Sequence, residues 1–258
     1  MKPLQPADFI SLNVFQERGW PIEVDLVYAK PDHPENHFPN LYHPEAKLLW
    51  AHRDLAPVIL LSSALCKARY GWKLAAHDCM RPVQAQAKMA EYGYPEELVS
   101  RPGMGAHPRG MSIDFLPIGV DMGTPYDYFA EDLNNNPAAR DTISFPGRTE
   151  NESAAICQRR ADFEEAVWQS ANALGQDILL LPEEWWDFRF QKEGSRPGST
   201  YWGDYEPVNE TTLPAYMHLV GRPEPAPSTV QHEWAEYAVT VERAVRKRAR
   251  QLLGANPS

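Results

Sequence analysis

Residues 105–116 read GAHPRGMSIDFL, and this stretch joins a tight loop to a predicted strand. Gly105 and Gly110 allow the loop to turn sharply, and Met111 to Leu116 is predicted to form the strand. His107 lies in the loop and Asp114 lies in the strand. An imidazole and a carboxylate are good zinc ligands. Alone, this spacing is weak support for a metal site, because a histidine in a Pro/Gly-rich loop is more often simply solvated.

The segments on both sides of this stretch predict an α+β layout. Many of the 24 prolines fall in three loop zones at about residues 31–44, 101–125 and 194–227, since proline opposes helices and central strands. Further strands are predicted at 23–29, 72–76, 178–181 and 185–190. Helices are predicted at 45–51, 57–70, 82–92, 152–174 and 231–253. We expect a catalytic body over residues 8–191, and a Pro-rich extension over residues 192–258 that ends in a helix packed on the same domain.

The composition indicates which partners and which cellular compartment to expect. The 258 residues carry a net charge of -10, which disfavours nucleic acid and anionic membranes as partners. No stretch approaches the roughly 20 apolar residues that cross a bilayer. The first 20 residues lack the apolar core of a signal peptide, which predicts a cytoplasmic protein, or a periplasmic one if a leader was removed. The three scattered cysteines predict reduced thiols rather than disulfides.

Two further segments carry groups suited to hydrolysis. PEEWWDF, residues 182–188, places Glu184 and Asp187 around two tryptophans. One carboxylate there could bind a metal and the other could take a proton from its water, although a buried aromatic strand with acidic edges is the plainer interpretation. AAHDCMRP, residues 75–82, places Arg81 before a helix. Arg81 is a candidate for binding a carboxylate or an oxyanion, or it forms a structural ion pair with Asp78.

In this order the three segments resemble the bacterial D-alanyl-D-alanine dipeptidases, the zinc peptidase family known from vancomycin resistance. HDCMRP, GAHPRGMSID and EEWWDF stand where that family has aromatic-Arg-Pro, Ser-x-His-x-x-Gly-x-x-x-Asp and Glu-x-Trp-His. DMGTPYD at residues 121–127 and the N-terminal VDLVYA and FPNLYHPEAKLL add to the resemblance, which covers about residues 8–191. It implies a small antiparallel sheet flanked by helices and the cleavage of a small D-amino-acid dipeptide.

The resemblance also implies a role for each site residue. His107 and Asp114 would be two ligands of one Zn²⁺, with Asp187 in the position of the third. Glu184 would be the general base and then the acid that protonates the leaving amine. Arg81 would stabilise the oxyanion, and the metal would polarise the carbonyl and lower the pKa of its water.

Two positions depart from the family pattern: Asp187 replaces a histidine and Gly105 replaces a serine. A His/Asp/Asp ligand set is one unit more negative than His/Asp/His, and its extra oxygen favours harder metals such as Mn²⁺. Loss of the serine hydroxyl removes a hydrogen bond to the substrate. His218 is a weaker candidate ligand, and His77 is expected to have a supporting or structural role.

Two other functions stay open at this point. A catalytically weak or silent binding protein on the same fold fits the changes at Asp187 and Gly105. A peptidoglycan D,D- or L,D-carboxypeptidase fits the motifs but needs an export signal and an open groove. The sequence indicates neither the oligomeric state nor the purpose of residues 192–258.

Overall fold

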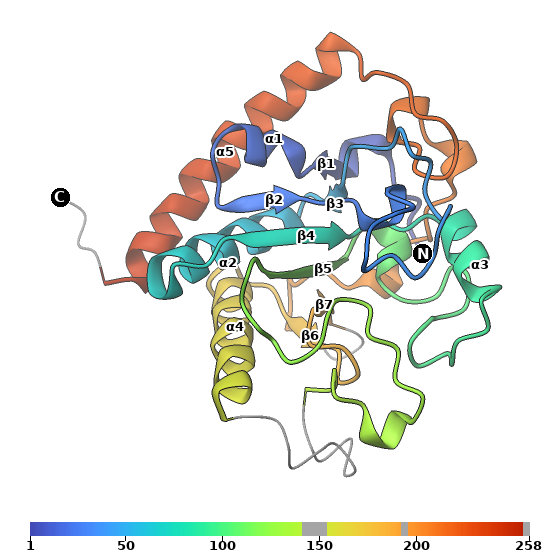
Figure 1. Ribbon diagram of the computed structural model, residues 1–258. Coiled ribbons are helices and arrows are strands. Elements are labelled where there is room, and N and C mark those ends of the chain that lie inside the picture. The colour runs from blue at the N-terminus through green and yellow to red at the C-terminus, as the bar shows by residue number, and fades with distance from the viewer. Residues whose placement is uncertain (141–153, 192–195, 255–258) are drawn as a thin grey trace.

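The computed structural model describes residues 1–140, 154–191 and 196–254, and over these residues the chain is a mixed α+β protein (Figure 1). Its α-helices are α1 (Asn13–Glu17), α2 (Leu55–Tyr70), α3 (Val83–Ala90), α4 (Ala154–Ala173) and α5 (Ser228–Leu252). Its strands are β1 (Phe9–Ser11), β2 (Ile22–Val24), β3 (Trp50–His52), β4 (Leu74–Asp78), β5 (Ser112–Pro117), β6 (Ile178–Leu180) and β7 (Asp187–Phe190). The predicted fold class is confirmed at this level.

The main sheet has five strands in the order β2-β4-β5-β7-β6. The β4–β5, β5–β7 and β6–β7 pairs are antiparallel, whereas β2 runs parallel to β4. The expected antiparallel sheet is therefore wrong at the β2 edge, because the chain crosses over through β3 and α2 before it forms β4. Strands β1 and β3 form a separate antiparallel pair.

The register of the main sheet brings three aspartates into one row. Asp114 on β5 is the direct partner of Asp78 on β4 and of Asp187 on β7. A register shift between Ala76 and Asp78 on β4 places Asp78, rather than His77, opposite Asp114. A bulge of this kind re-aims a side chain, and bulges are frequent next to functional sites.

The two faces of the sheet have different roles because side chains alternate along a strand. Asp114 and Asp187 point to one face, while their neighbours Phe115 and Phe188 point to the other. There Phe163 of α4 packs on them, with ring centroids 5.1 Å from Phe115 and 5.2 Å from Phe188. The apolar face of the sheet packs on α4, and the aspartates lie on the opposite face.

Helix α2 is the centre of the helical layer. It contacts α4, α5 and β3, and residues from Leu55 to Cys66 are buried almost all round the helix. A helix that is apolar on every side is a core helix. The prediction for residues 57–70 is thus confirmed, and Pro57 is tolerated because it lies in the first turn, where its missing N–H has no helical acceptor.

The predicted helix at residues 45–51 is wrong, because Trp50 to His52 pairs with Phe9 to Ser11 as a strand. The predicted strand at 23–29 is shorter, since Val27–Ala29 is a 3-10 turn. The start of the predicted helix at 152 lies outside the described residues, and the remainder of it is α4. The other predicted helices and strands are present with ends shifted by a few residues.

The C-terminal extension lies against the body in two places. Helix α5 contacts α1 and α2, and its Trp234 ring lies 5.2 Å from that of Trp50 (Figure 1). Before α5, Val208 donates a backbone hydrogen bond to the carbonyl of Pro108 at 2.6 Å. The extension therefore touches the loop that carries His107. Among the described residues, no helix has both the length and the apolar content to cross a membrane.

Candidate metal centre

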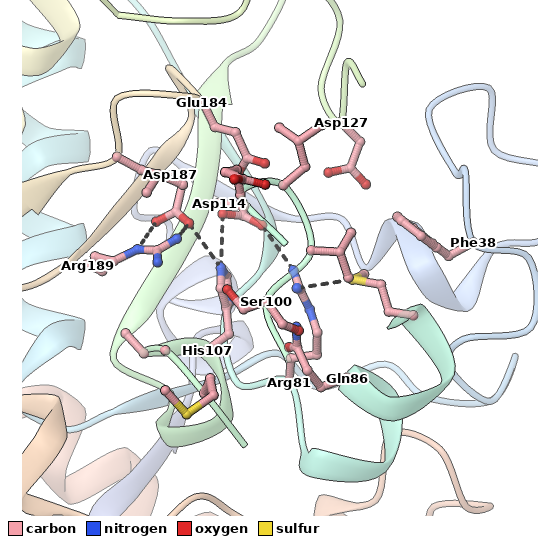
Figure 2. Close-up of a pocket in the computed structure, with 18 of the residues that line it drawn as sticks. Phe38, Arg81, Gln86, Ser100, His107, Asp114, Asp127, Glu184, Asp187 and Arg189 are labelled. Carbon is pink, nitrogen blue, oxygen red and sulfur yellow. Dashed lines mark hydrogen bonds and ion pairs between the residues drawn. The ribbon is translucent and has the colours of Figure 1, made fainter. Parts of the chain in front are cut away.

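The three segments singled out in the sequence converge on one cavity. Arg81, His107, Asp114, Glu184 and Asp187 all line it (Figure 2). The segments are also joined through the backbone, because the Arg81 N–H donates to the carbonyl of His107 at 3.0 Å. The cavity volume is about 30 Å³, which is space for a few water molecules.

The row of three aspartates concentrates negative charge beside this cavity, which Asp114 and Asp187 line. Like charges directly opposite each other on neighbouring strands are destabilising. The outer aspartates each have an arginine: Arg81 Nε lies 2.7 Å from Asp78 Oδ2, and Arg189 binds both oxygens of Asp187. The central one, Asp114, has a weaker ion pair, with 3.5 Å between its Oδ2 and Arg81 Nη2.

His107 is oriented by the backbone. Its Nδ1 lies 2.8 Å from the carbonyl oxygen of Cys79, so Nδ1 carries the proton and donates it there. This leaves Nε2 to face the carboxylates, 3.3 Å from Asp114 Oδ1 and 3.5 Å from Asp187 Oδ2. Burial alone would lower the pKa of His107, but the nearby carboxylates, with Asp114 foremost, outweigh burial and raise it to about 10.

Asp114 supplies the clearest sign of a missing cation. Its Oδ1 is fully buried and has no hydrogen-bond partner. Buried polar atoms are almost always satisfied, and one without a partner needs an explanation such as an ion. The orphaned oxygen faces His107 Nε2, so two good ligand atoms of different chemistry point at the same place.

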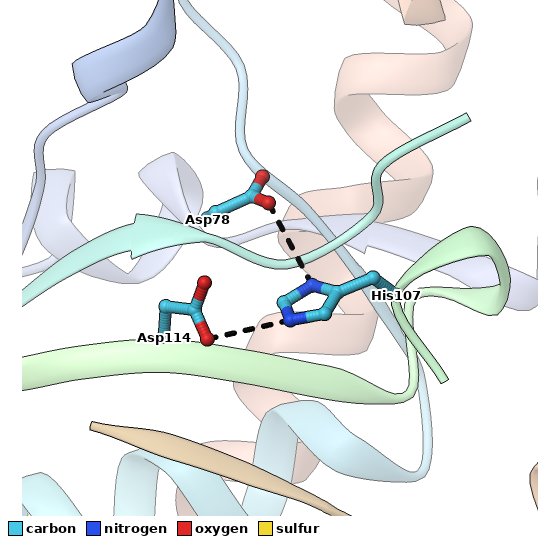
Figure 3. Close-up of side chains that lie close together, drawn as sticks. All are labelled: Asp78, His107 and Asp114. Carbon is cyan, nitrogen blue, oxygen red and sulfur yellow. Dashed lines mark ion pairs between the residues drawn. The ribbon is translucent and has the colours of Figure 1, made fainter. Parts of the chain in front are cut away.

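Asp78, His107 and Asp114 form a buried group whose ligand atoms lie within 4.8 Å of one another and could hold a metal ion (Figure 3). Asp78 approaches Nδ1 of His107, at 3.6 Å, and not Nε2. Both oxygens of Asp78 are also engaged, Oδ1 by the Tyr42 hydroxyl at 2.7 Å and Oδ2 by Arg81. These contacts describe Asp78 better as a support for Arg81 than as a free ligand.

Asp187, predicted as the third ligand, lies at the site but is already paired. Arg189, two residues along β7, donates Nε to Oδ1 at 3.1 Å and Nη2 to Oδ2, and the Ser112 hydroxyl donates to Oδ1 at 2.6 Å. Burial would raise the pKa of Asp187, but Arg189 and His107 hold it far below its usual range. The role of Arg189 was missed from the sequence, although i, i+2 spacing on a strand puts both side chains on one face.

Glu184 and Asp127 give the cavity two carboxyl groups that are not part of the aspartate row. Glu184 lies in the turn before β7, and its pKa is well above the usual range because it is buried and close to Asp187 and Asp114. Asp127 was noted only as part of DMGTPYD; its Oδ2 accepts a 2.6 Å hydrogen bond from Tyr28, and burial raises its pKa. Its positive φ of 52° is unusual for a residue other than glycine, and such backbone positions cluster at functional sites.

Arg81 forms the structural ion pair considered for it, and its role toward a substrate stays a prediction. It makes the structural ion pair with Asp78, and the same guanidinium reaches Asp114 and lines the cavity. The two other histidines lie elsewhere. His218 Nε2 is 3.2 Å from the carbonyl of Leu213, and His77 Nδ1 is 3.1 Å from that of Asp25, so neither faces the row of aspartates.

The loop around His107 is fixed by a buried arginine that the sequence did not reveal. Arg109 donates Nη1 to the carbonyls of Gly103 and Gly105, at 3.0 and 2.8 Å, and Nε to the carbonyl of Tyr205 at 2.8 Å. One side chain thus donates hydrogen bonds to three carbonyls, two from the loop and one from the extension. This arrangement makes part of the extension a structural element of the site.

No model of a known protein family matches the chain, and no curated protein is significantly similar to it. What the site does therefore follows from its residues and their geometry.

Proposed function

We propose that the protein is a metal-dependent hydrolase that splits a small dipeptide of D-amino acids, of the D-Ala-D-Ala type. The observation that carries the proposal is the buried Oδ1 of Asp114, which accepts no hydrogen bond and lies 3.3 Å from Nε2 of His107, in a cavity that also holds Glu184. The order of the motifs, which resembles that of the D-alanyl-D-alanine dipeptidases, supplies the reaction and the substrate class.

His107 Nε2, Asp114 and Asp187 are the side chains that would hold the ion. The donor set of one imidazole and two carboxylates suits zinc, and its oxygen content also admits Mn²⁺. Arg189 changes the charge expected from this set. Its positive charge offsets the extra negative charge that Asp187 brings in place of a histidine, so the site as a whole matches a His/Asp/His set in net charge.

A bound divalent cation would polarise the scissile carbonyl and lower the pKa of an attacking water. Glu184 would accept the proton of that water and pass it to the leaving amine, since its carboxyl has no hydrogen bond to any described residue. The guanidinium of Arg81 would bind the developing oxyanion, and Asp78 with Tyr42 holds that guanidinium in place.

The cavity favours a small and positively charged substrate end. Asp127 lies on the other side of Asp114 from Arg189 in Figure 2, and its carboxyl oxygens would accept hydrogen bonds from the substrate's ammonium group. The cavity offers little free space, which favours a small substrate over long peptidoglycan stems.

A binding protein without catalysis is the second candidate, and one observation favours it. The Asp187–Arg189 ion pair satisfies the third ligand without any metal. Such a protein would bind the dipeptide and leave it intact. The presence of Glu184 in the same cavity, free of hydrogen bonds to described residues, favours the enzyme instead.

The test is an assay of all four alanyl-alanine stereoisomers with protein loaded with zinc or manganese. We expect the D,D isomer to be cleaved fastest and a chelator to abolish the activity. Binding of the D,D isomer with no cleavage under either metal would support the binding protein. Faster cleavage of the L,L isomer would contradict the substrate class.

A further inference from the structure

One edge of the Arg189 guanidinium has no partner in the cavity. Arg189 uses Nε and Nη2 for Asp187, and its Nη1 makes no hydrogen bond to any residue that the structure describes. The side chain is only 14% exposed. Nη1 carries two N–H donors, and it is not among the fully buried atoms that lack a partner, so these donors can exchange water for an anionic acceptor. The edge is therefore suited to an anionic ligand.

A second donor flanks the same space. A Cβ placed on Gly105 would lie 3.8 Å from Ser100 Oγ and 4.0 Å from Arg189 Nη1, so both atoms border the point that Gly105 leaves open. Gly105 has a φ of +79°, which opposes any side chain there. The Ser100 carbonyl accepts a 2.7 Å hydrogen bond from Gln86 Nε2, which ties this segment to α3.

We propose that Arg189 Nη1 and Ser100 Oγ bind the terminal carboxylate of the substrate, so that the protein selects peptides with a free carboxyl end. A guanidinium N–H and a hydroxyl are strong donors to a carboxylate. This inference rests on the proposed dipeptide hydrolysis in the same cavity. In this inference, the Ser100 hydroxyl takes the place of the serine hydroxyl that is absent at position 105.

The charges around the cavity favour one orientation of a zwitterionic dipeptide. Arg189 supplies positive charge to a carboxylate there, whereas Asp114, Asp127, Glu184 and Glu97, which also line the cavity, supply none. Figure 2 shows Arg189 and Asp127 on opposite sides of Asp114. A dipeptide with its carboxylate at Arg189 and its ammonium group toward Asp127 would place its peptide bond near the aspartate row, where Glu184 also points into the cavity.

The test compares D-Ala-D-Ala with its carboxamide, which differs only at the end group. Calorimetry with chelator-treated protein should show that the free acid binds about 100-fold more tightly, since hydrogen bonds to a charged group are stronger than those to a neutral one. Arg189→Gln should reduce this ratio to a few-fold, and Ser100→Ala should reduce it to about tenfold. Arg101→Gln is the matched control, because Arg101 adjoins Ser100 but is exposed and pairs with Glu96; its ratio should stay at the wild-type value.

Equal binding of acid and amide by the wild type, binding of neither, or an unchanged ratio in both variants would overturn the proposal. Ser100→Ala alone decides the matter if Arg189→Gln does not fold. The outcome is independent of catalysis. If the protein prefers the acid but never cleaves it, the carboxylate site is supported and the proposed hydrolysis is contradicted. If it cleaves the acid and the amide at equal rates, the hydrolysis is supported and the carboxylate site is contradicted.

Discussion

Asp114 and Asp187 are direct cross-strand partners on β5 and β7, and both carboxylates approach the same nitrogen of His107. Two carboxylates in this position repel each other unless a positive charge lies between or beside them. Arg189 neutralises Asp187 from the side, while Asp114 keeps one buried oxygen free. Asp114 can therefore bind a cation directly, whereas a cation that binds Asp187 must share this carboxylate with Arg189.

Metal binding should release about one proton at pH 7.5, because ligands must be deprotonated before they bind. The pKa of His107 in the metal-free protein is raised to about 10, so its Nε2 is protonated at that pH. Apparent affinity should then rise about tenfold per pH unit and level off near pH 10. Calorimetry in buffers of different ionisation enthalpy counts the protons. Binding with no proton release would contradict coordination through Nε2.

Glu184→Gln should lower turnover by about 10²–10⁴-fold while the metal content stays at one ion per chain, since a general base contributes about that much. The amide keeps the shape of the side chain but cannot accept the proton. Single-turnover rates and elemental analysis on the same sample measure both effects. Glu183→Gln next to it is the matched control, because Glu183 is outside the residues that line the cavity. Equal losses in the two variants would remove Glu184 from the mechanism.

Arg189→Gln should tighten metal binding by about tenfold, because a charge at contact distance that competes for Asp187 is removed. The more negative site should also make the bound water less acidic, and turnover should fall. Competition with a chromophoric chelator gives the affinity. Unchanged or weaker metal binding in this variant would contradict competition between Arg189 and the ion for Asp187. Arg196→Gln serves as a control for the loss of one charge from a surface pair.

Arg109→Gln should destabilise the fold by about 2–4 kcal/mol, since it strips the donors from three backbone carbonyls around a buried side chain. His107 follows two of these carbonyls, those of Gly103 and Gly105, in the same loop, so metal affinity should fall with stability. Urea unfolding and metal titration measure the two effects. Stability lost with metal affinity unchanged would show that the extension does not position the His107 loop.

Much of this fold could be predicted from local sequence patterns. Apolar periodicity located α4 and α5, the apolar stretch at residues 57–70 located α2 as a mostly buried helix, and the Gly/Pro-rich loop before β5 was evident around His107. Residues 45–51 were assigned wrongly because β3 exists only through its pairing with β1, some 40 positions away. Local propensity cannot show such a partner.

The sequence singled out residues that lie together in the structure, but it did not reveal the electrostatics around them. His107, Asp114, Glu184, Asp187 and Arg81 do line one cavity. The place of Asp78 in the row depends on a register shift in β4, which no spacing in the sequence reveals. The Asp187–Arg189 pair was within reach, because two opposite charges at i, i+2 on a strand share a face. Whether residues 8–191 and 192–258 are separate units stays a prediction.

The most direct test of the metal centre is the anomalous diffraction of a crystal of the zinc-loaded protein. We expect one ion at about 2.0–2.2 Å from His107 Nε2 and from carboxylate oxygens of Asp114 and Asp187, with the Glu184 carboxyl facing it across the cavity. An ion bound to Asp78 and Nδ1 of His107, or no ion at this row of aspartates at saturating zinc, would contradict the account.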